Sequence, residues 1–323
     1  MKKVLTILCL LTSCFTAPGG NASVTDTTHI HHTERDLVIS HGKVTLPATL
    51  CLPHHTTTGR GVPLVVMVHG SGPCDRNETI GPNTPFRDMA HALARAGIAS
   101  LRYDKRTFVY GAQVARVGGA DTYDTEVVHD AIQAIVVARS LNGVDSTHIF
   151  VMGHSLGGAL VPRIILHSPV PIAGGVLWSA PARPLDVLLR EQLRHIASQS
   201  GQSPMVADQA YAQIIQQLPQ PYLDFARTHR PIDEAGQTSV PLLIIGGGHD
   251  YQVPSADYLM WRLGLVHRPN TEYLWIEDGD HLLRTLPRMA RPEDYMQHHP
   301  MSEGGIKGII HFLQKHSAKQ DEA

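Results

Sequence analysis

Ser155 stands in the residue pattern of an activated nucleophile. The apolar segment 149–152 has the length of a buried strand, and it runs directly into Gly-His-Ser-Leu-Gly-Gly at 153–158, which opens a helix-like stretch. In this G-x-S-x-G pattern the glycines avoid collisions where the backbone folds sharply, and the serine hydroxyl is exposed at the carboxyl edge of a sheet. The pattern predicts that Ser155 attacks an acyl carbon.

A serine hydroxyl needs a base to accept its proton, and the base needs a carboxylate to fix its tautomer. In this arrangement the acid and then the histidine follow the serine along the chain, in loops after later strands. Asp250 follows the apolar strand 241–245 in a glycine-rich loop, and His281 comes shortly after the strand 272–276. We therefore predict a triad of Ser155, Asp250 and His281.

Other acids and one other histidine lie close to these positions. Asp278 and Asp280 precede His281 and are interpreted as shaping its loop, whereas Asp257 lies in a predicted helix. His249 is adjacent to the predicted acid and is expected to line the site.

An acyl transfer also needs N–H donors for the oxyanion. The backbone N–H of Leu156, directly after the nucleophile, is one candidate, and the loop after an earlier strand supplies the other. We assign the second donor to Ser71, with Gly72 as the fallback. By position, Gly72, His154 and His249 are predicted to contact substrate, and His69 is interpreted as structural.

Several apolar segments alternate with helical patterns and would position these loops. A strand, helix, strand rhythm requires crossover connections, which indicates a mostly parallel sheet with helices on both faces, the α/β class. The segments 36–40 and 43–46 alternate instead and predict antiparallel edge strands. The expected buried strands cover 63–68, 98–103, 147–152, 172–178, 241–245 and 272–276, and the expected helices begin with 86–96 and 127–141.

The segment 184–239 interrupts this rhythm. It contains helix-like patterns at 185–196 and 207–218 and is too long for an ordinary connection. We interpret it as a helical cap inserted into a single domain that covers 25–323. The alternative is an enlarged crossover that does not contact substrate.

Taken together, the motifs resemble those of the α/β-hydrolase superfamily, and within it the exported serine esterase and dienelactone-hydrolase-like branch. The resemblance covers about 36–316 and is carried by residues 69–73, 102–106, 153–158, the Asp250 loop and 279–281. Ser155 departs from the cysteine nucleophile of a true dienelactone hydrolase and from the aspartate of a haloalkane dehalogenase, and it therefore points to ester, thioester or amide hydrolysis. Asp104-Lys105-Arg106 is interpreted as a set of structural ion pairs rather than an anion site.

The first 22 residues are typical of a secretory signal peptide. Two lysines precede an apolar run at 4–11, which is far shorter than a membrane-spanning helix. The residues before Cys14 resemble a bacterial lipoprotein cleavage box, which predicts a lipid anchor at this cysteine; ordinary cleavage near Ala17 or Ala22 is the alternative. The chain is expected to be exported, either to the cell envelope or to the periplasm or medium. Cys51 and Cys74 could then form a disulfide or remain as two small buried side chains.

Composition excludes some classes of function. Charged residues make up 17% of the 323 residues and the formal net charge is −2, which argues against disorder and against a nucleic-acid partner. The 21 histidines are many for this length. Their clusters at 29–32, 54–55 and 298–299 suggest a metal scavenger as a remote alternative, but histidines in polar segments are more often solvated.

The leading hypothesis is a serine hydrolase that cleaves small carboxylic esters through an acyl-enzyme, with no cofactor and no metal. A serine peptidase or amidase with the same triad is the alternative, since the motifs do not distinguish oxygen from nitrogen leaving groups. The remote alternative is a non-catalytic binding protein anchored to the envelope. The sequence does not indicate which oligomeric state the protein has.

Overall fold

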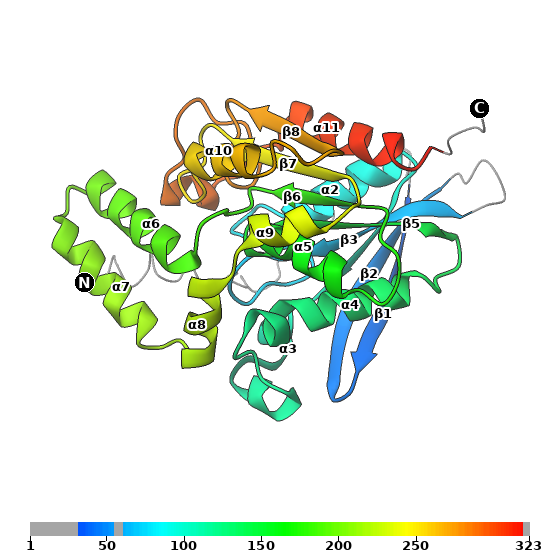
Figure 1. Ribbon diagram of the computed structural model, residues 1–323, viewed down its shortest axis with the longest axis horizontal. Helices are drawn as coiled ribbons and strands as arrows, with labels where there is room; N and C mark the ends of the chain where they lie inside the picture. Colours follow the sequence, from blue (N-terminus) through cyan, green and yellow to red (C-terminus); the bar gives the residue numbers. More distant parts are fainter. Residues whose placement is uncertain (1–31, 55–60, 319–323) are drawn as a thin grey trace.

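An eight-stranded sheet runs through the middle of the molecule in the order β1-β2-β4-β3-β5-β6-β7-β8 (Figure 1). The computed structural model describes residues 32–54 and 61–318. β2 pairs antiparallel with both β1 and β4, and every other neighbouring pair is parallel. The predicted α/β class is therefore confirmed. The strands are β1 (His32–His41), β2 (Val44–Pro53), β3 (Val62–Val68), β4 (Ala99–Tyr103), β5 (Val144–His154), β6 (Gly174–Trp178), β7 (Leu242–Gly247) and β8 (Thr271–Ile276).

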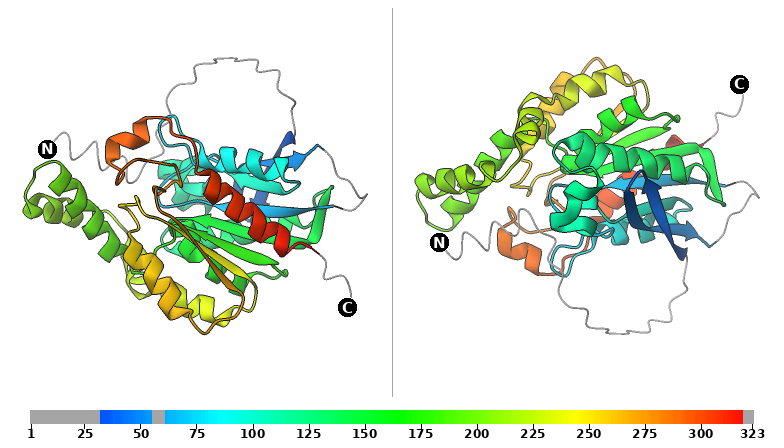
Figure 2. Two further views of the ribbon diagram at one scale, coloured as in Figure 1. Left: turned by 90° about the horizontal axis from the view of Figure 1, so that it is seen from above. Right: turned by 90° about the horizontal axis from the view of Figure 1, so that it is seen from below.

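Helices cover both faces of the sheet, because the parallel strands are apolar on both sides. On one face, α2 (Pro85–Arg95) and α11 (Glu303–Lys315) pack on alternate residues of the central strands such as Val65 and Met67. On the other face, α4 (His129–Ala138), α5 (Leu156–His167) and α10 (Ser255–Gly264) pack on the residues between them, such as Leu64 and Val66. Figure 2 shows the two layers of helices with the sheet between them.

The hairpin β1–β2 forms the edge of the sheet, as the alternating sequence predicts. Its turn includes Gly42 with φ of +55°, a left-handed conformation that glycine adopts without strain.

β5 is longer than predicted, since its pairing with β3 begins at Val144. Shorter elements follow β4, namely α3 (Arg106–Tyr110), a 3-10 helix at Gly111–Val117 and one turn of π-helix at Asp124–Val128.

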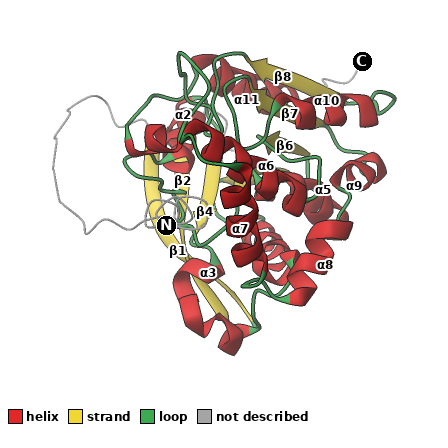
Figure 3. Cartoon of the chain, turned by 90° about the vertical axis from the view of Figure 1, so that its left-hand side faces the viewer, coloured by secondary structure: helices red, strands yellow, loops and turns green. Residues whose placement is uncertain are grey.

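Four helices lie between β6 and β7, in the segment expected to be a cap. They are α6 (Leu185–Gln199), α7 (Pro204–Ile215), α8 (Gln220–Thr228) and α9 (Pro231–Gln237). Figure 3 shows α6, α7 and α8 in front of the strands at one end of the sheet. α6 and α7 share a hydrophobic cluster that is separate from the two main cores and includes Leu193, Ala207 and Ile214. The sequence pattern predicted only the first two of these helices.

The predicted signal peptide, including Cys14, lies outside the described residues. Within the described part of the chain, no helix is both long and apolar enough to cross a lipid bilayer. Cys51 and Cys74 are both buried, and no disulfide joins them. Burial raises the pKa of the Cys51 thiol to about 11.

Candidate active site

Ser155 lies at a sharp turn between the end of β5 and the start of α5. Its φ of +53° and ψ of −121° place a non-glycine residue in the left-handed region, and its N–H donates to the carbonyl of Trp178 at 2.9 Å. A Cβ on Gly153 would lie 2.2 Å from the carbonyl oxygen of Gly157, and one on Gly157 would lie 2.3 Å from the carbonyl oxygen of Val68. Both flanking positions therefore require glycine, for the steric reason inferred from the sequence.

His281 and Asp250 are hydrogen-bonded to each other. Nδ1 of His281 donates to Oδ2 of Asp250 at 2.7 Å, and both side chains are buried. The second carboxylate oxygen accepts the N–H groups of Gln252 and Val253 at 2.7 and 2.9 Å, which fix the carboxylate from behind. Because Nδ1 is engaged, Nε2 is the ring nitrogen of His281 that remains available for proton transfer.

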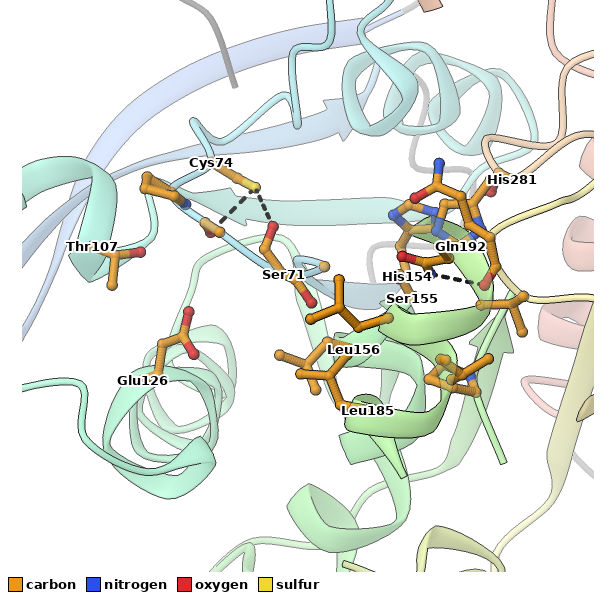
Figure 4. Close-up of a pocket in the computed structure, with 18 of the residues that line it drawn as sticks. Ser71, Cys74, Thr107, Glu126, His154, Ser155, Leu156, Leu185, Gln192 and His281 are labelled. Atoms are coloured by element: carbon orange, nitrogen blue, oxygen red, sulfur yellow. Dashed lines mark hydrogen bonds between the residues drawn. The ribbon is translucent and has the colours of Figure 1, made fainter. Parts of the chain in front are cut away.

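Ser155 and His281 line one cavity of about 360 Å³ (Figure 4). One apolar part of its wall comes from the start of α5 and from the segment between β6 and β7. These apolar residues are Leu156, Leu185, Leu188, Leu189, Ile214 and Leu218. Gln192, also on α6, reaches the opposite wall, where its side-chain amide donates to the backbone carbonyl of Gln252 at 2.8 Å. The side-chain amide of Gln252 donates in turn to the hydroxyl of Tyr295 at 3.0 Å. The cavity is thus enclosed partly by residues of the segment that the sequence suggested as a cap.

The predicted oxyanion donors lie on the wall of the same cavity. Ser71, Gly72 and Leu156 all line it. Leu156 is the first residue of α5, where a backbone N–H has no partner within the helix. The N–H of Ser71 donates to no acceptor within the described residues. Both amides are therefore available to a ligand oxygen, and their assignment as oxyanion donors stays a prediction.

Glu78 is a buried carboxylate beside the nucleophile that the sequence analysis did not identify. Its Oε1 accepts the N–H of Gly70 at 2.7 Å, and its Oε2 lies 3.0 Å from Nδ1 of His154. Nε2 of His154 in turn donates to the backbone carbonyl of His281 at 3.0 Å. Glu78 thereby connects the loop after β3 to the loop that carries His281.

Glu78 and His154 form a buried ion pair. Burial alone would raise the pKa of Glu78 and lower that of His154. Their mutual attraction outweighs burial, so the pKa of the carboxyl is lowered and that of the imidazole is raised. His154 lines the cavity, as predicted, but both of its ring nitrogens have partners within the protein.

Two other histidines near the predicted triad do not line the cavity. The ring of His69 packs against Phe86 and Tyr103, and burial lowers its pKa to about 4. His249, which the sequence placed against the substrate, points instead at the segment after β8, since its Nδ1 donates to the carbonyl of Leu286 at 2.8 Å. The prediction of a substrate contact for His249 therefore has no counterpart in the cavity wall.

The three charged residues after β4 are all ion-paired. Asp104 binds Arg76 through both carboxylate oxygens, Lys105 lies 2.7 Å from Glu126, and Arg106 binds Asp130 through two nitrogens. This arrangement agrees with the structural interpretation rather than with an anion site.

The acids that compete with Asp250 are engaged elsewhere. Asp280 accepts two backbone N–H groups of its loop and the guanidinium of Arg284. Asp257, on α10, accepts the N–H groups of Ala182 and Arg183 just after β6. Both therefore fix loops around the site.

Among the described residues, one group of potential metal ligands lies together, away from the cavity. His32, Glu34 and His91 place their ligand atoms within 4.8 Å of one another. Glu34 already binds the buried guanidinium of Arg102, a cation that would repel a metal ion. The hydrogen bond from His91, together with Arg102, lowers the pKa of Glu34 to about 2 despite partial burial. This donor set therefore does not indicate a metal site.

Comparisons with known proteins agree with this fold. The model of the alpha/beta hydrolase family matches residues 65–297. Esterase EstD of Thermotoga maritima is 32% identical over 299 residues, which cover 87% of this chain and 68% of the relative. An esterase of Pyrococcus furiosus superposes with a TM-score of 0.60 at 18% identity, covering 94% of this chain and 97% of that one. An acylaminoacyl peptidase of Pyrococcus horikoshii gives 0.61 at 17% identity, covering 91% and 43%. At such identities the two structures show a shared fold and no more.

Proposed function

The chain belongs to the α/β-hydrolase family, and we propose that it hydrolyses carboxylic esters with Ser155 as nucleophile, His281 as base and Asp250 as acid. One observation carries the proposal: a serine at a left-handed turn shares a cavity with a histidine whose other ring nitrogen is bonded to a buried carboxylate. The similarity to a curated esterase at 32% identity supports the choice of esters.

In the proposed acylation step, Oγ of Ser155 attacks the ester carbonyl carbon while its proton moves to Nε2 of His281. The carbonyl π electrons move to oxygen, and the N–H groups of Ser71 and Leu156 stabilise the oxyanion. When the carbonyl re-forms, the carbon–oxygen bond to the alcohol breaks, and His281 returns the proton to the leaving oxygen. Asp250 stabilises the imidazolium in between.

In the proposed deacylation step, His281 takes a proton from a water molecule as the water oxygen attacks the acyl carbon. A second oxyanion forms and collapses, the bond to Oγ breaks, and the proton passes from His281 to Ser155. The free enzyme and the carboxylic acid result. The apolar wall from α5, α6 and α7 favours uncharged acyl groups over charged ones.

The test is to replace Ser155 by alanine and measure turnover of short-chain nitrophenyl esters. We expect a rate at least about 10³-fold lower, with an unchanged circular dichroism spectrum and loss of labelling by a fluorophosphonate. Ser168→Ala, just after α5, is the matched control and should react normally. Full ester turnover by Ser155→Ala would refute the assignment. Aminoacyl arylamides assayed in parallel would reveal an amidase if they are cleaved faster than the esters.

We also propose that the protein is exported and anchored through a lipid on Cys14. The leader sequence supports this proposal. Expression in a bacterium with labelled palmitate should label the wild type and leave Cys14→Ser unlabelled. Equal labelling of both would contradict the anchor.

A further inference from the structure

A buried lysine holds the peptide between Gly70 and Ser71 from behind. Nζ of Lys105 donates to the carbonyl oxygen of Gly70 at 2.8 Å and pairs with Oε1 of Glu126 at 2.7 Å. Gly70, Ser71 and Glu126 line the cavity, whereas Lys105 does not. The ammonium group therefore lies behind these residues, between the Gly70 carbonyl and the Glu126 carboxylate, and does not itself reach the cavity.

The direction of the Ser71 N–H follows from this contact. The structure has no cis peptide among its described residues, and in a trans planar peptide the carbonyl of one residue and the N–H of the next point in opposite directions. With the Gly70 carbonyl fixed on Lys105, the N–H of Ser71 must point away from the lysine. It is the amide that donates to no acceptor within the described part of the chain.

The preceding peptide is fixed as well. The N–H of Gly70 donates to Glu78 at 2.7 Å. A Cβ on Gly70 would lie 3.2 Å from both Oε1 of Glu78 and Cβ of Ser155, so the loop packs directly on the nucleophile. Two buried charges of opposite sign thus hold Gly70, one at its N–H and one at its carbonyl.

Lys105 is positioned to do more than hold the loop. Burial alone would lower the pKa of its ammonium group, but Glu126 and the other neighbours raise it, so the lysine is charged at neutral pH. A positive charge on a carbonyl oxygen withdraws electrons from the peptide and makes its N–H a stronger donor. The effect is large only in a water-excluded site, and Lys105 is 2% exposed.

We propose that Lys105 is a positioning residue for the oxyanion hole: through the Gly70 carbonyl it orients the Ser71 N–H and strengthens it as a donor, while Glu126 neutralises its charge. This inference rests on the proposed esterase function. It goes beyond the structural interpretation of the Asp104-Lys105-Arg106 segment, because it predicts an effect on the transition state and not only on folding.

The test separates binding of the transition state from binding of the ground state. A trifluoromethyl ketone accepts Oγ of Ser155 at its carbonyl carbon, passes the serine proton to His281 and leaves an oxyanion in the hole. The carboxamide of the same acyl chain binds without this addition. Lys105→Met combined with Glu126→Gln removes the charged pair together and leaves no buried ion unpaired. We expect the inhibition constant of the ketone to rise about 10- to 100-fold and that of the carboxamide to change less than about threefold.

Arg106→Met combined with Asp130→Asn is the matched control. This neighbouring pair is equally buried, but its other hydrogen bonds reach Gly119 and His41 and not the loop after β3. The control should bind both inhibitors within about threefold of wild type even if its melting temperature falls.

The proposal is overturned if the Lys105 and Glu126 double variant keeps its affinity for the ketone, or if it loses affinity for both inhibitors equally. If this double variant fails to fold, ketone binding is measured on Lys105→Gln instead, since the neutral amide of glutamine can still donate to the Gly70 carbonyl. We expect about 3- to 10-fold weaker ketone binding there, and an unchanged value overturns the proposal. A wild-type protein that neither cleaves esters nor binds the ketone would overturn the esterase proposal too.

Discussion

Replacing Glu78 by glutamine tests the buried pair that links the loop after β3 to His154. The substitution keeps the size of the side chain and an oxygen that can accept the N–H of Gly70, but it removes the charge that lies 3.0 Å from the imidazole. We expect it to lower the free energy of unfolding by an amount that depends strongly on pH.

The pH window follows from the two pKa shifts. The pKa of His154 is raised above its ordinary 6.5, so its contribution is complete below about pH 6.5 and is lost as pH rises through the folded pKa. The pKa of Glu78 is lowered below its ordinary 4.5, so its contribution is complete above that value and is lost as pH falls through the folded pKa. The pair therefore stabilises the fold most between these two ordinary values.

The expected magnitude comes from the full burial of both groups. Removing one partner of a buried ion pair costs about 3 to 5 kcal/mol when the other partner stays charged. At about pH 5.5 the His154 of Glu78→Gln must either keep an uncompensated charge or lose a proton, so we expect about 3 kcal/mol of destabilisation. As pH rises through the folded pKa of His154 the imidazole loses its proton, so at an upper point of pH 9 we expect a smaller cost, which falls toward the roughly 1 kcal/mol of a neutral hydrogen bond.

The assay is urea unfolding, followed by tryptophan fluorescence, at both pH values. Glu126→Gln is the matched control: its partner Lys105 has a pKa raised above 10.5 and stays charged throughout, so its cost should be the same at both pH values. An equal cost for Glu78→Gln at the two pH values would show that His154 does not carry the proton, and would refute the reasoning.

Three further predictions concern the turn, the triad and the cavity. Gly157→Ala would place a Cβ 2.3 Å from the Val68 carbonyl, and since backbone cannot yield there, we expect a loss of at least about 3 kcal/mol in urea unfolding; wild-type stability would contradict the steric argument. Asp250→Asn should lower kcat about 10³- to 10⁴-fold with an unchanged circular dichroism spectrum, because the amide cannot hold the required tautomer of His281, and a loss under tenfold would argue against the triad. Leu185→Trp should lower kcat/KM at least about tenfold for octanoyl esters but less than threefold for acetyl esters, since it fills the cavity; equal losses would place the acyl group elsewhere.

The sheet was predictable because its strands are buried on both faces and read as continuous apolar runs. The nucleophile turn was predictable as well, since sterics leave only glycine at positions 153 and 157. α8 and α9 were missed because they have only nine and seven residues, which is too short for helical periodicity to be recognised in the sequence. Each begins with a proline in its first turn, and α9 adds two acidic residues there, but these signals alone do not establish a helix.

The supporting charges of the site were not predictable. Glu78 lies in a polar segment of a kind that is usually exposed, and nothing in the local sequence shows that its backbone enters the left-handed region with φ of +53° and turns the carboxylate inward. Lys105 and Glu126 are far apart in the chain, so their pairing depends on the packing of α4 and the preceding helical turn against β4. His249 was misplaced because sequence adjacency to Asp250 does not determine the direction of a side chain in a loop.

Because β6 pairs directly with β7, the sheet does not depend on the length of the chain that joins these two strands. Gly175–Trp178 align with Leu242–Ile245 whatever the length of the intervening chain, and Asp257 fixes the point where that chain leaves β6. Since loop-closure entropy changes by only about 0.6 kcal/mol for each doubling of length, a shorter or longer excursion costs the sheet little. The hydrophobic cluster shared by α6 and α7 belongs to the excursion itself, whereas Tyr222, Ala226 and Ala235 of α8 and α9 pack in the main core. Grafting only the part that carries α6 and α7 from another family member is therefore a direct route to altered acyl selectivity with the catalytic loops left in place.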